Sequence, residues 1–205
     1  MERVSTIILR HGIEIEHPLQ VTLDFLEAYS SYEPDNSSPS ASFDESDLRL
    51  ANRGGARISA AEIAAILDRR DKIERALRKI RPDASLSDAT RSIPWMPLTQ
   101  LFDAFADIRG VGFSKMTKAL HTKRPALIPM LDSVVQAYLT GDVPGTGSQG
   151  SFGEHATALV RTYKRDLGRN SSALHQLRRE LARREYKLTE VRILDILIWS
   201  VSAPT

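Results

Sequence analysis

Two glycines and a downstream carboxylate form the most informative pattern in this chain. Gly110 and Gly112 flank Val111 in a tight Gly-x-Gly turn, and Asp132 follows twenty residues after Gly112. Glycine permits positive φ and lets an anion approach the main chain closely, because it has no Cβ. The N–H groups at the start of a following helix point toward such an anion, and the helix dipole favours negative charge there. The turn therefore predicts a phosphate site, and the carboxylate could stabilise positive charge that develops on a sugar.

Basic side chains surround the same turn. Lys115 and Lys118 lie in the helix expected after Gly112, and a second glycine turn, at residues 54–55, stands between two arginines. Cationic groups neutralise phosphates, so we expect both turns to contact a nucleic-acid backbone. The candidate nucleic-acid-binding residues are Gly110, Val111, Gly112, Ser114, Lys115, Lys118, Lys123, Arg124, Arg53 and Arg57. The alternatives are a simple tight turn between packed helices and, for the two arginines, ion pairs with the acidic residues at 44–47.

The hairpin resembles that of the helix-hairpin-helix DNA glycosylase superfamily. The resemblance covers residues 98–140 and is carried by the segments 105–120 (FADIRGVGFSKMTKAL) and 124–132 (RPALIPMLD). The second segment is similar to the superfamily's approach to its catalytic aspartate, which implies a glycosylase-like fold with Asp132 as the catalytic residue. Members that also cleave the backbone have a Schiff-base lysine two residues after the second glycine, where this chain has Ser114. The resemblance therefore implies a monofunctional DNA N-glycosylase without lyase activity.

Asp132 has two alternative roles. As the catalytic residue, it would stabilise oxocarbenium character at C1′ and orient a water. As an N-cap, it would accept a backbone N–H and stabilise the following helix by about 1 kcal/mol. One side chain can perform both roles, and Asp132 is the predicted catalytic residue. The superfamily follows its aspartate with Thr-His and then an Arg, whereas this chain continues Ser-Val-Val-Gln.

The chain is also similar to a smaller bacterial family of unknown function. The shared segments are residues 123–135 (KRPALIPMLDSVV) and residues 192–199 (RILDILIW). This resemblance spans about residues 47–200 and implies no known activity. Within the second segment, Arg192 and Asp195 form either a structural pair or part of a pocket lining.

Composition excludes several classes of site. The chain of 205 residues has no cysteine, which excludes disulfides, thiolate zinc sites and iron–sulfur clusters. Its five histidines have no metal-site spacing, so we expect no metal and no cofactor. No segment resembles a signal peptide, and no apolar run approaches the roughly 20 residues of a membrane span, so we expect a cytoplasmic protein without membrane contact.

The net charge of +2 hides an asymmetry between the two parts of the chain. Residues 1–50 carry 3 basic and 10 acidic side chains, whereas residues 51–205 carry 25 basic and 16 acidic ones. A basic body is typical of a surface that binds a polyanion, although Arg-rich solvated helix faces give the same composition.

The periodicity of apolar residues predicts an all-α fold. Residues 4–9 are expected to form either one short N-terminal strand or an ordered tail. Ser59 and Glu62 form a capping box at the start of one helix. Flexible loops are expected at residues 33–46 and 141–153, which are rich in Ser, Pro and Gly or Asp. The helices are expected at residues 18–30, 59–79, 98–108, 113–121, 132–139, 152–166, 171–185 and 188–201. We divide the chain into an acidic N-terminal arm, residues 1–46, and a helical domain, residues 47–205, with the hairpin at about 98–121.

Two further predictions concern aromatic and apolar surfaces. Trp95, Phe113, Tyr138 and Phe152 are candidates for a wall that stacks against a flipped base, or else they belong to the core. The C-terminal helix is apolar on more than one side, so it packs in the core or in a homodimer through the C-terminal helices.

Taken together, these patterns predict a protein that binds double-stranded DNA, with the N-glycosylase activity that the resemblance implies. Two alternatives remain open at this stage: a non-catalytic helix-hairpin-helix module that binds nucleic acid, and a regulatory protein-interaction protein in which the acidic arm masks the basic face or engages a partner.

Overall fold

The computed structural model describes residues 5–29, 40–140 and 150–202. Within these ranges the chain is almost entirely helical, with one two-stranded sheet, so the all-α prediction with a short N-terminal strand is confirmed. Most of the loop expected at 141–153 and much of the loop expected at 33–46 lie outside the described residues. None of the described helices is both long and apolar enough to span a lipid bilayer.

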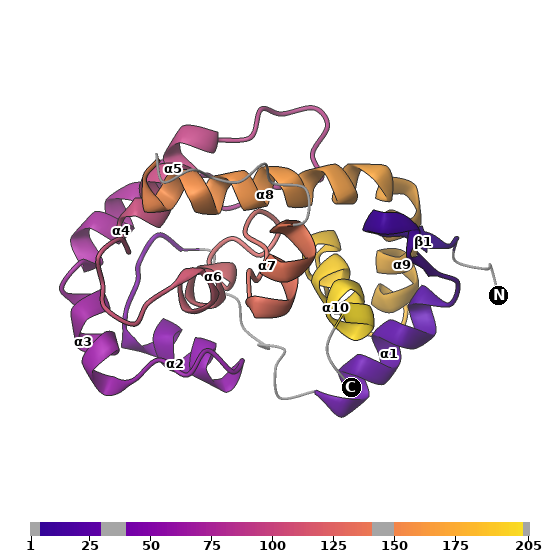
Figure 1. Cartoon of the computed structure of the whole chain (residues 1–205), viewed down its shortest axis with the longest axis horizontal. Coiled ribbons are helices and arrows are strands. Elements are labelled where there is room, and N and C mark those ends of the chain that lie inside the picture. The colour runs from indigo at the N-terminus through magenta and orange to yellow at the C-terminus, as the bar shows by residue number, and fades with distance from the viewer. Residues whose placement is uncertain (1–4, 30–39, 141–149, 203–205) are drawn as a thin grey trace.

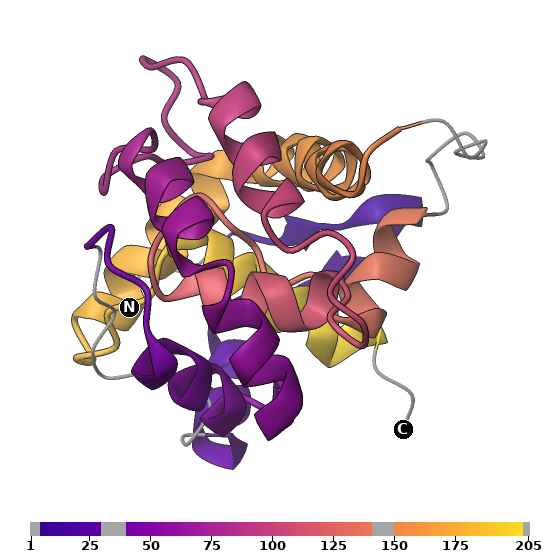
Figure 2. The same cartoon turned by 90° about the vertical axis from the view of Figure 1, so that its left-hand side faces the viewer.

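A long helix, α8, runs along the length of the molecule and connects two groups of shorter elements (Figure 1). Helices α2 to α6 lie toward one of its ends, and the sheet, α1, α9 and α10 lie toward the other, with α7 between them (Figures 1 and 2). The helices are α1 (Pro18–Ala28), α2 (Glu45–Arg53), α3 (Ala60–Leu67), α4 (Arg70–Arg78), α5 (Trp95–Asp103), α6 (Phe113–His121), α7 (Ser133–Thr140), α8 (Phe152–Arg169), α9 (Ser171–Ala182) and α10 (Glu190–Ser202).

The N-terminal residues pack into the same hydrophobic core as the rest of the chain. Strands β1 (Ile7–Ile8) and β2 (Glu14–Ile15) pair antiparallel across a short 3-10 turn, with Ile7 opposite Ile15. Both isoleucines are buried, and α1 packs along α10. The described part of the predicted acidic arm is therefore continuous with the helical body.

Local sequence signals account for where several helices begin. Capping boxes start α2, α3 and α8, each with a polar N-cap side chain that accepts a backbone N–H and an acidic side chain that reaches back. The prediction of one helix over residues 59–79 was wrong, because the chain changes direction at Asp68 and Arg69 between α3 and α4. Ile66 and Ile73 are buried on the two sides of this break. Apolar periodicity continues across the break and so does not reveal it.

Buried cations connect segments that are distant in the sequence. Arg124 is 1% exposed and donates hydrogen bonds to the carbonyl oxygens of Leu77, at 3.0 Å, and Ile80, at 2.8 Å. Leu77 lies in the last turn of α4 and Ile80 lies just after it, where carbonyl oxygens lack the full set of helical donors; the Leu77 carbonyl oxygen also accepts the N–H of Ile80, at 3.0 Å. Lys123 forms an ion pair of 2.6 Å with Asp47 of α2, and both side chains are buried. The connector from α6 to α7 is therefore fixed against α2 and α4.

Replacement of Arg124 by methionine should lower the free energy of unfolding by about 3 kcal/mol, because the buried carbonyl oxygen of Ile80 would lose its donor and that of Leu77 would keep only the N–H of Ile80. Urea unfolding at neutral pH measures this change. Arg78→Met provides the control, since Arg78 is exposed and forms nothing stronger than a surface ion pair with Glu74, at 3.6 Å. The control should change stability by less than about 0.5 kcal/mol. Equal effects of the two substitutions would contradict the structural role of Arg124.

Candidate functional site

The predicted hairpin lies between α5 and α6, but its first helix spans Trp95–Asp103 instead of the expected residues 98–108, and residues 104–112 connect it to α6. Gly110 adopts a positive φ of 82°, and the N–H of Val111 donates to the carbonyl oxygen of Ile108 at 3.0 Å. Gly112 is exposed and forms the N-cap of α6 without a side-chain cap. In the part of the chain that the structure describes, the N–H groups of residues 112–115 have no hydrogen-bond acceptor. The turn thus has the open helix start that a phosphate site requires.

An internal carboxylate lies against one side of this turn. The Lys115 ammonium group donates to both carboxylate oxygens of Glu62, at 2.7 and 2.8 Å. Glu62 also contacts Gly110 so closely that a Cβ at this glycine would overlap with Oε1, whereas a Cβ at Gly112 would meet open space. The hydrogen bond from Lys115 is the main cause that lowers the pKa of Glu62. The Gly110 side therefore already holds an anion, and the Gly112 side is accessible.

Lys123 and Arg124 were predicted to contact nucleic acid, and the structure corrects both assignments. Lys123 is 2% exposed and paired with Asp47, and Arg124 is directed to backbone carbonyls. Long cationic side chains are buried only when charged or polar groups compensate for lost hydration, and both sites provide such partners. Neither side chain can reach a phosphate on the surface.

Asp132 lies where the connector enters α7. Its Oδ1 accepts the N–H of Val135 at 3.0 Å, and its carbonyl oxygen accepts the N–H of Gln136 at 2.8 Å. Asp132 therefore caps α7. Its Oδ2 has no hydrogen-bond partner among the described residues and remains available. The connector is held by the N–H of Leu131, which donates to Thr117 Oγ1 of α6 at 2.9 Å.

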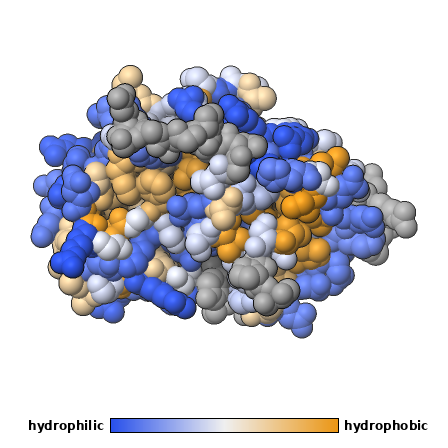
Figure 3. Space-filling view, viewed as in Figure 1, coloured by the Kyte–Doolittle hydropathy of each residue, from blue (hydrophilic) through white to orange (hydrophobic). Residues whose placement is uncertain are grey.

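Asp132 also lines a cavity of about 160 Å³ between α1, α6, α7 and α10. Hydrophobic residues reach the surface close to this region, where α1 and α10 lie side by side (Figure 3). The lining combines aromatic, acidic and basic side chains with a methionine, a valine and a glycine. The residues are Phe25, Tyr29, Gly54, Lys118, Met130, Asp132, Val135, Arg192, Asp195 and Trp199.

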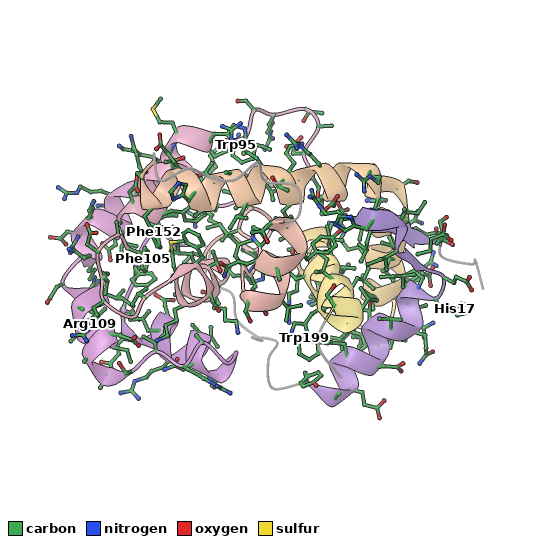
Figure 4. All side chains as sticks on the ribbon, viewed as in Figure 1. His17, Trp95, Phe105, Arg109, Phe152 and Trp199 are labelled. Atoms are coloured by element: carbon green, nitrogen blue, oxygen red, sulfur yellow. The ribbon has the colours of Figure 1, made fainter. Side chains whose placement is uncertain are left out.

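Three aromatic rings form one wall of the cavity. Trp199 of α10, which Figure 4 labels, makes edge contacts with Phe25 of α1 and with Tyr29 at the end of α1, with ring centroids 5.5 and 5.3 Å apart. A planar ring bound in this cavity could stack on such a surface. In the sequence, Trp199 and Tyr29 have no signal beyond the apolar periodicity of their segments. Their meeting depends on the packing of α1 against α10, for which the sequence gives no local signal.

The aromatic residues predicted for this role lie elsewhere. Phe113 packs against Phe152, with ring centroids 4.7 Å apart, and the buried Tyr138 accepts the N–H of Arg10 through its hydroxyl group. Trp95 is covered by the guanidinium group of Arg161, and both Trp95 and Phe152 are far from Trp199 in Figure 4. None of these four residues lines this cavity, and all four pack in or against the hydrophobic core, which was the alternative expected for them.

Asp195 is the most deeply buried charged residue of the cavity. Its side chain is 2% exposed, and its Oδ2 accepts the N–H of Met130 at 3.0 Å. Its Oδ1 is buried and has no hydrogen-bond partner among the residues that the structure describes. Burial raises the pKa of this carboxyl to about 7, against the opposing effect of Arg192. Of the alternatives kept open for Arg192 and Asp195, the lining of a pocket is the one that the geometry supports.

Cations surround the opening of the cavity. Lys118 Nζ donates to the carbonyl oxygen of Gly55 at 3.3 Å, and burial lowers the pKa of this lysine. Arg57 and Arg192 lower it further, whereas the charge of Asp132 opposes this shift, so these groups act on one another electrostatically. Arg53 and Arg57 are exposed on the turn after α2. The arrangement can hold a planar ring, place carboxyl groups beside it and attract an anion at the rim.

No group of three or more acidic or histidine side chains suited to a metal ion occurs in the described ranges.

In α10, all side chains from Val191 to Ile198 are buried within the single chain. A homodimer through the C-terminal helices stays a prediction.

Comparison with known proteins identifies a family but no activity. A model for a family of unknown function, DUF6308, matches residues 25–202, and the chain belongs to this family. No curated protein and no solved structure matches the chain. The matched range begins at Phe25 and includes every residue that lines the cavity, whereas the β1–β2 hairpin precedes it.

The raised pKa of Asp195 should make stability depend on pH. Folded protein holds the proton more tightly than unfolded chain, so the free energy of unfolding should fall as pH rises from 3.8 to about 7. Urea unfolding at several pH values between 3.8 and about 7 measures this fall in the free energy of unfolding. Asp195→Asn should remove this component, and at pH 8 the variant should be at least as stable as the wild type. If the free energies of unfolding of wild type and Asp195→Asn changed with pH in the same way, the assignment of the raised pKa to Asp195 would be contradicted.

Proposed function

We propose that this family member binds double-stranded DNA and hydrolyses the N-glycosidic bond of a single base held in the cavity. The observation that carries the proposal is that Asp132 both caps α7 and lines a cavity with an aromatic wall. The capping bond fixes the carboxyl group, and one of its oxygens remains available to the cavity. A fixed carboxylate next to a ring-binding surface is the arrangement that this reaction requires.

The size and lining of the cavity favour a single base over a larger ligand. Its volume of about 160 Å³ is below the roughly 300–1,000 Å³ that holds a typical drug-sized ligand. Stacking against Trp199 and its neighbours suits a flat ring of any base, because every base has a π-face. A base in duplex DNA cannot enter such a site without leaving the stack, so the reaction includes base flipping.

The chemistry assigned to Asp132 is electrostatic. Cleavage of the bond between C1′ and the base develops positive charge on the sugar, which a carboxylate stabilises. The available Oδ2 accepts a hydrogen bond from the attacking water and orients it. Ser114 stands where a Schiff-base lysine would be, and Lys115 is occupied by Glu62, so water is the nucleophile. The reaction requires no cofactor.

DNA is held on the surface that continues from the cavity. Arg53 and Arg57 are exposed there, and the start of α6 presents its free N–H groups at Gly112. Lys118 lies six residues after Gly112, which corresponds to about 9 Å along the helix. A phosphate at the start of α6 and a base beside Lys118 are therefore separated by a distance comparable to one or two nucleotides.

The test of the catalytic role is Asp132→Asn, assayed for base release from duplexes that contain uracil, hypoxanthine or 7-methylguanine. Asparagine is also a good N-cap, so stability should change little. Loss of the carboxylate should lower the single-turnover rate by about 100-fold or more. Asp44→Asn alters the N-cap aspartate of α2, which is not among the lining residues, and should leave release unchanged. Unchanged release by the Asp132 variant would remove this residue from the mechanism.

Binding to DNA is tested separately through its salt dependence. Arg53→Gln together with Arg57→Gln should weaken duplex binding and reduce the slope of log K against log salt by about 2, because two phosphate contacts are lost. Fluorescence anisotropy at several salt concentrations measures both the affinity for the duplex and the slope of log K against log salt. Arg183→Gln with Arg184→Gln removes the same charge at the end of α9 and should leave the slope unchanged. An equal loss in both double variants would indicate only a general charge effect and would count against the proposed surface.

A further inference from the structure

One lysine in the lining of the cavity has no carboxylate partner among the residues that the structure describes. We propose that Lys118 is a specificity-determining residue, whose ammonium group donates a hydrogen bond to a ring carbonyl oxygen of the bound base. This inference rests on the proposed function and adds a substrate class: deaminated bases, in which a carbonyl oxygen has replaced the amino group of a normal base.

The lysines on α6 and just after it differ in their partners. Lys115 donates to both carboxylate oxygens of Glu62, and Lys123 forms a buried ion pair with α2 at 2.6 Å. Within the described part of the chain, Lys118 makes one hydrogen bond, to the carbonyl oxygen of Gly55 at 3.3 Å. This distance is longer than usual for an N–H donor and an oxygen acceptor. Because an ammonium group has three N–H donors, Lys118 keeps donors for a ligand.

Lys118 belongs to the side of α6 that faces the cavity. Its side chain is half-buried and lines the cavity together with Asp132 and Arg192. The charges of Asp132 and Arg192 act on the pKa of Lys118 in opposite directions, so the ammonium group lies within electrostatic range of both. Burial lowers this pKa, because an ammonium group that is removed from water loses hydration. A carbonyl oxygen of a bound base would replace part of that hydration.

The chemistry of an ammonium group distinguishes a deaminated base from its parent. Lysine donates hydrogen bonds and accepts none. Cytosine and adenine carry an amino group, which is itself a donor, whereas uracil and hypoxanthine carry a carbonyl oxygen at the same ring position. The parent bases would therefore place one donor against another. Stacking near Trp199 suits all four rings, so a polar group such as Lys118 has to provide the selection.

The experiment measures binding without base release. Duplexes carry uracil, cytosine, hypoxanthine or adenine on a 2′-fluoroarabino sugar, which resists cleavage of the glycosidic bond. Each test base stands opposite an abasic residue, so none of them has a pairing partner. Fluorescence anisotropy gives Kd for wild type, Lys118→Met and Lys72→Met. Lys72 is the matched control, because its ammonium group also donates to a backbone carbonyl oxygen, that of Asp103, at 3.3 Å and is not among the lining residues.

The expected result is a change in the ratio of two dissociation constants. Wild type should bind each deaminated base about 10-fold or more tightly than its parent base, because a hydrogen bond from a charged donor is gained. In Lys118→Met the two bases of each pair should bind within about threefold of each other, whereas Lys72→Met should keep the wild-type ratio. Each ratio compares two duplexes with one protein sample, so a loss of folded protein leaves it unchanged.

The other outcomes overturn defined claims. If wild type does not prefer the deaminated bases, or if Lys118→Met keeps the full preference, the assignment of Lys118 is overturned. An equal loss of preference in Lys72→Met would overturn it too, since it would indicate a general effect of charge. Hydrolysis is judged separately, by base release from cleavable duplexes. A wild-type protein that selects deaminated bases but releases none would refute the hydrolysis and support the Lys118 contact.

Discussion

The arrangement of the whole site depends on the buried guanidinium group of Arg124. It donates to the carbonyl oxygens of Leu77, in the last turn of α4, and of Ile80, just after it, while the neighbouring Lys123 pairs with Asp47 of α2. Charged groups that are removed from water require such partners, so the chain can follow only one path between α6 and α7. That path ends at Asp132. The two cations that suggested a binding surface instead determine where the carboxylate lies.

The cavity brings together groups that would not be stable in isolation. An apolar aromatic wall lowers the local dielectric, and this strengthens every electrostatic interaction among Asp132, Asp195, Lys118 and Arg192. The same burial raises the pKa of the Asp195 carboxyl to about 7, whereas Asp132 accepts an amide hydrogen bond at a helix start. Two residues of one type thereby acquire different chemistry from their surroundings. A site of this kind is preorganised, because its polar groups are held by backbone contacts before a ligand arrives.

The hairpin carries an anion of its own. Glu62 occupies the Gly110 side and neutralises Lys115, while the start of α6 at Gly112 stays accessible. The turn therefore combines an internal carboxylate with an open set of amide groups. A phosphate that binds there meets the dipole of α6 on one side and the negative charge of Glu62 on the other, so the position of the backbone is limited to the Gly112 side.

The sequence by itself determined the helical class, the starts of most helices and the position of Asp132 at a helix start. These features depend on neighbouring residues: capping boxes, proline at the start of α1 and apolar periodicity. Only the tertiary structure decided which aromatic rings line the cavity, since Phe25 and Trp199 are 174 residues apart and meet through the packing of α1 on α10. It also decided the burial of Arg124, because a solvent-exposed and a buried cation have the same local sequence pattern, and only their distant partners distinguish them.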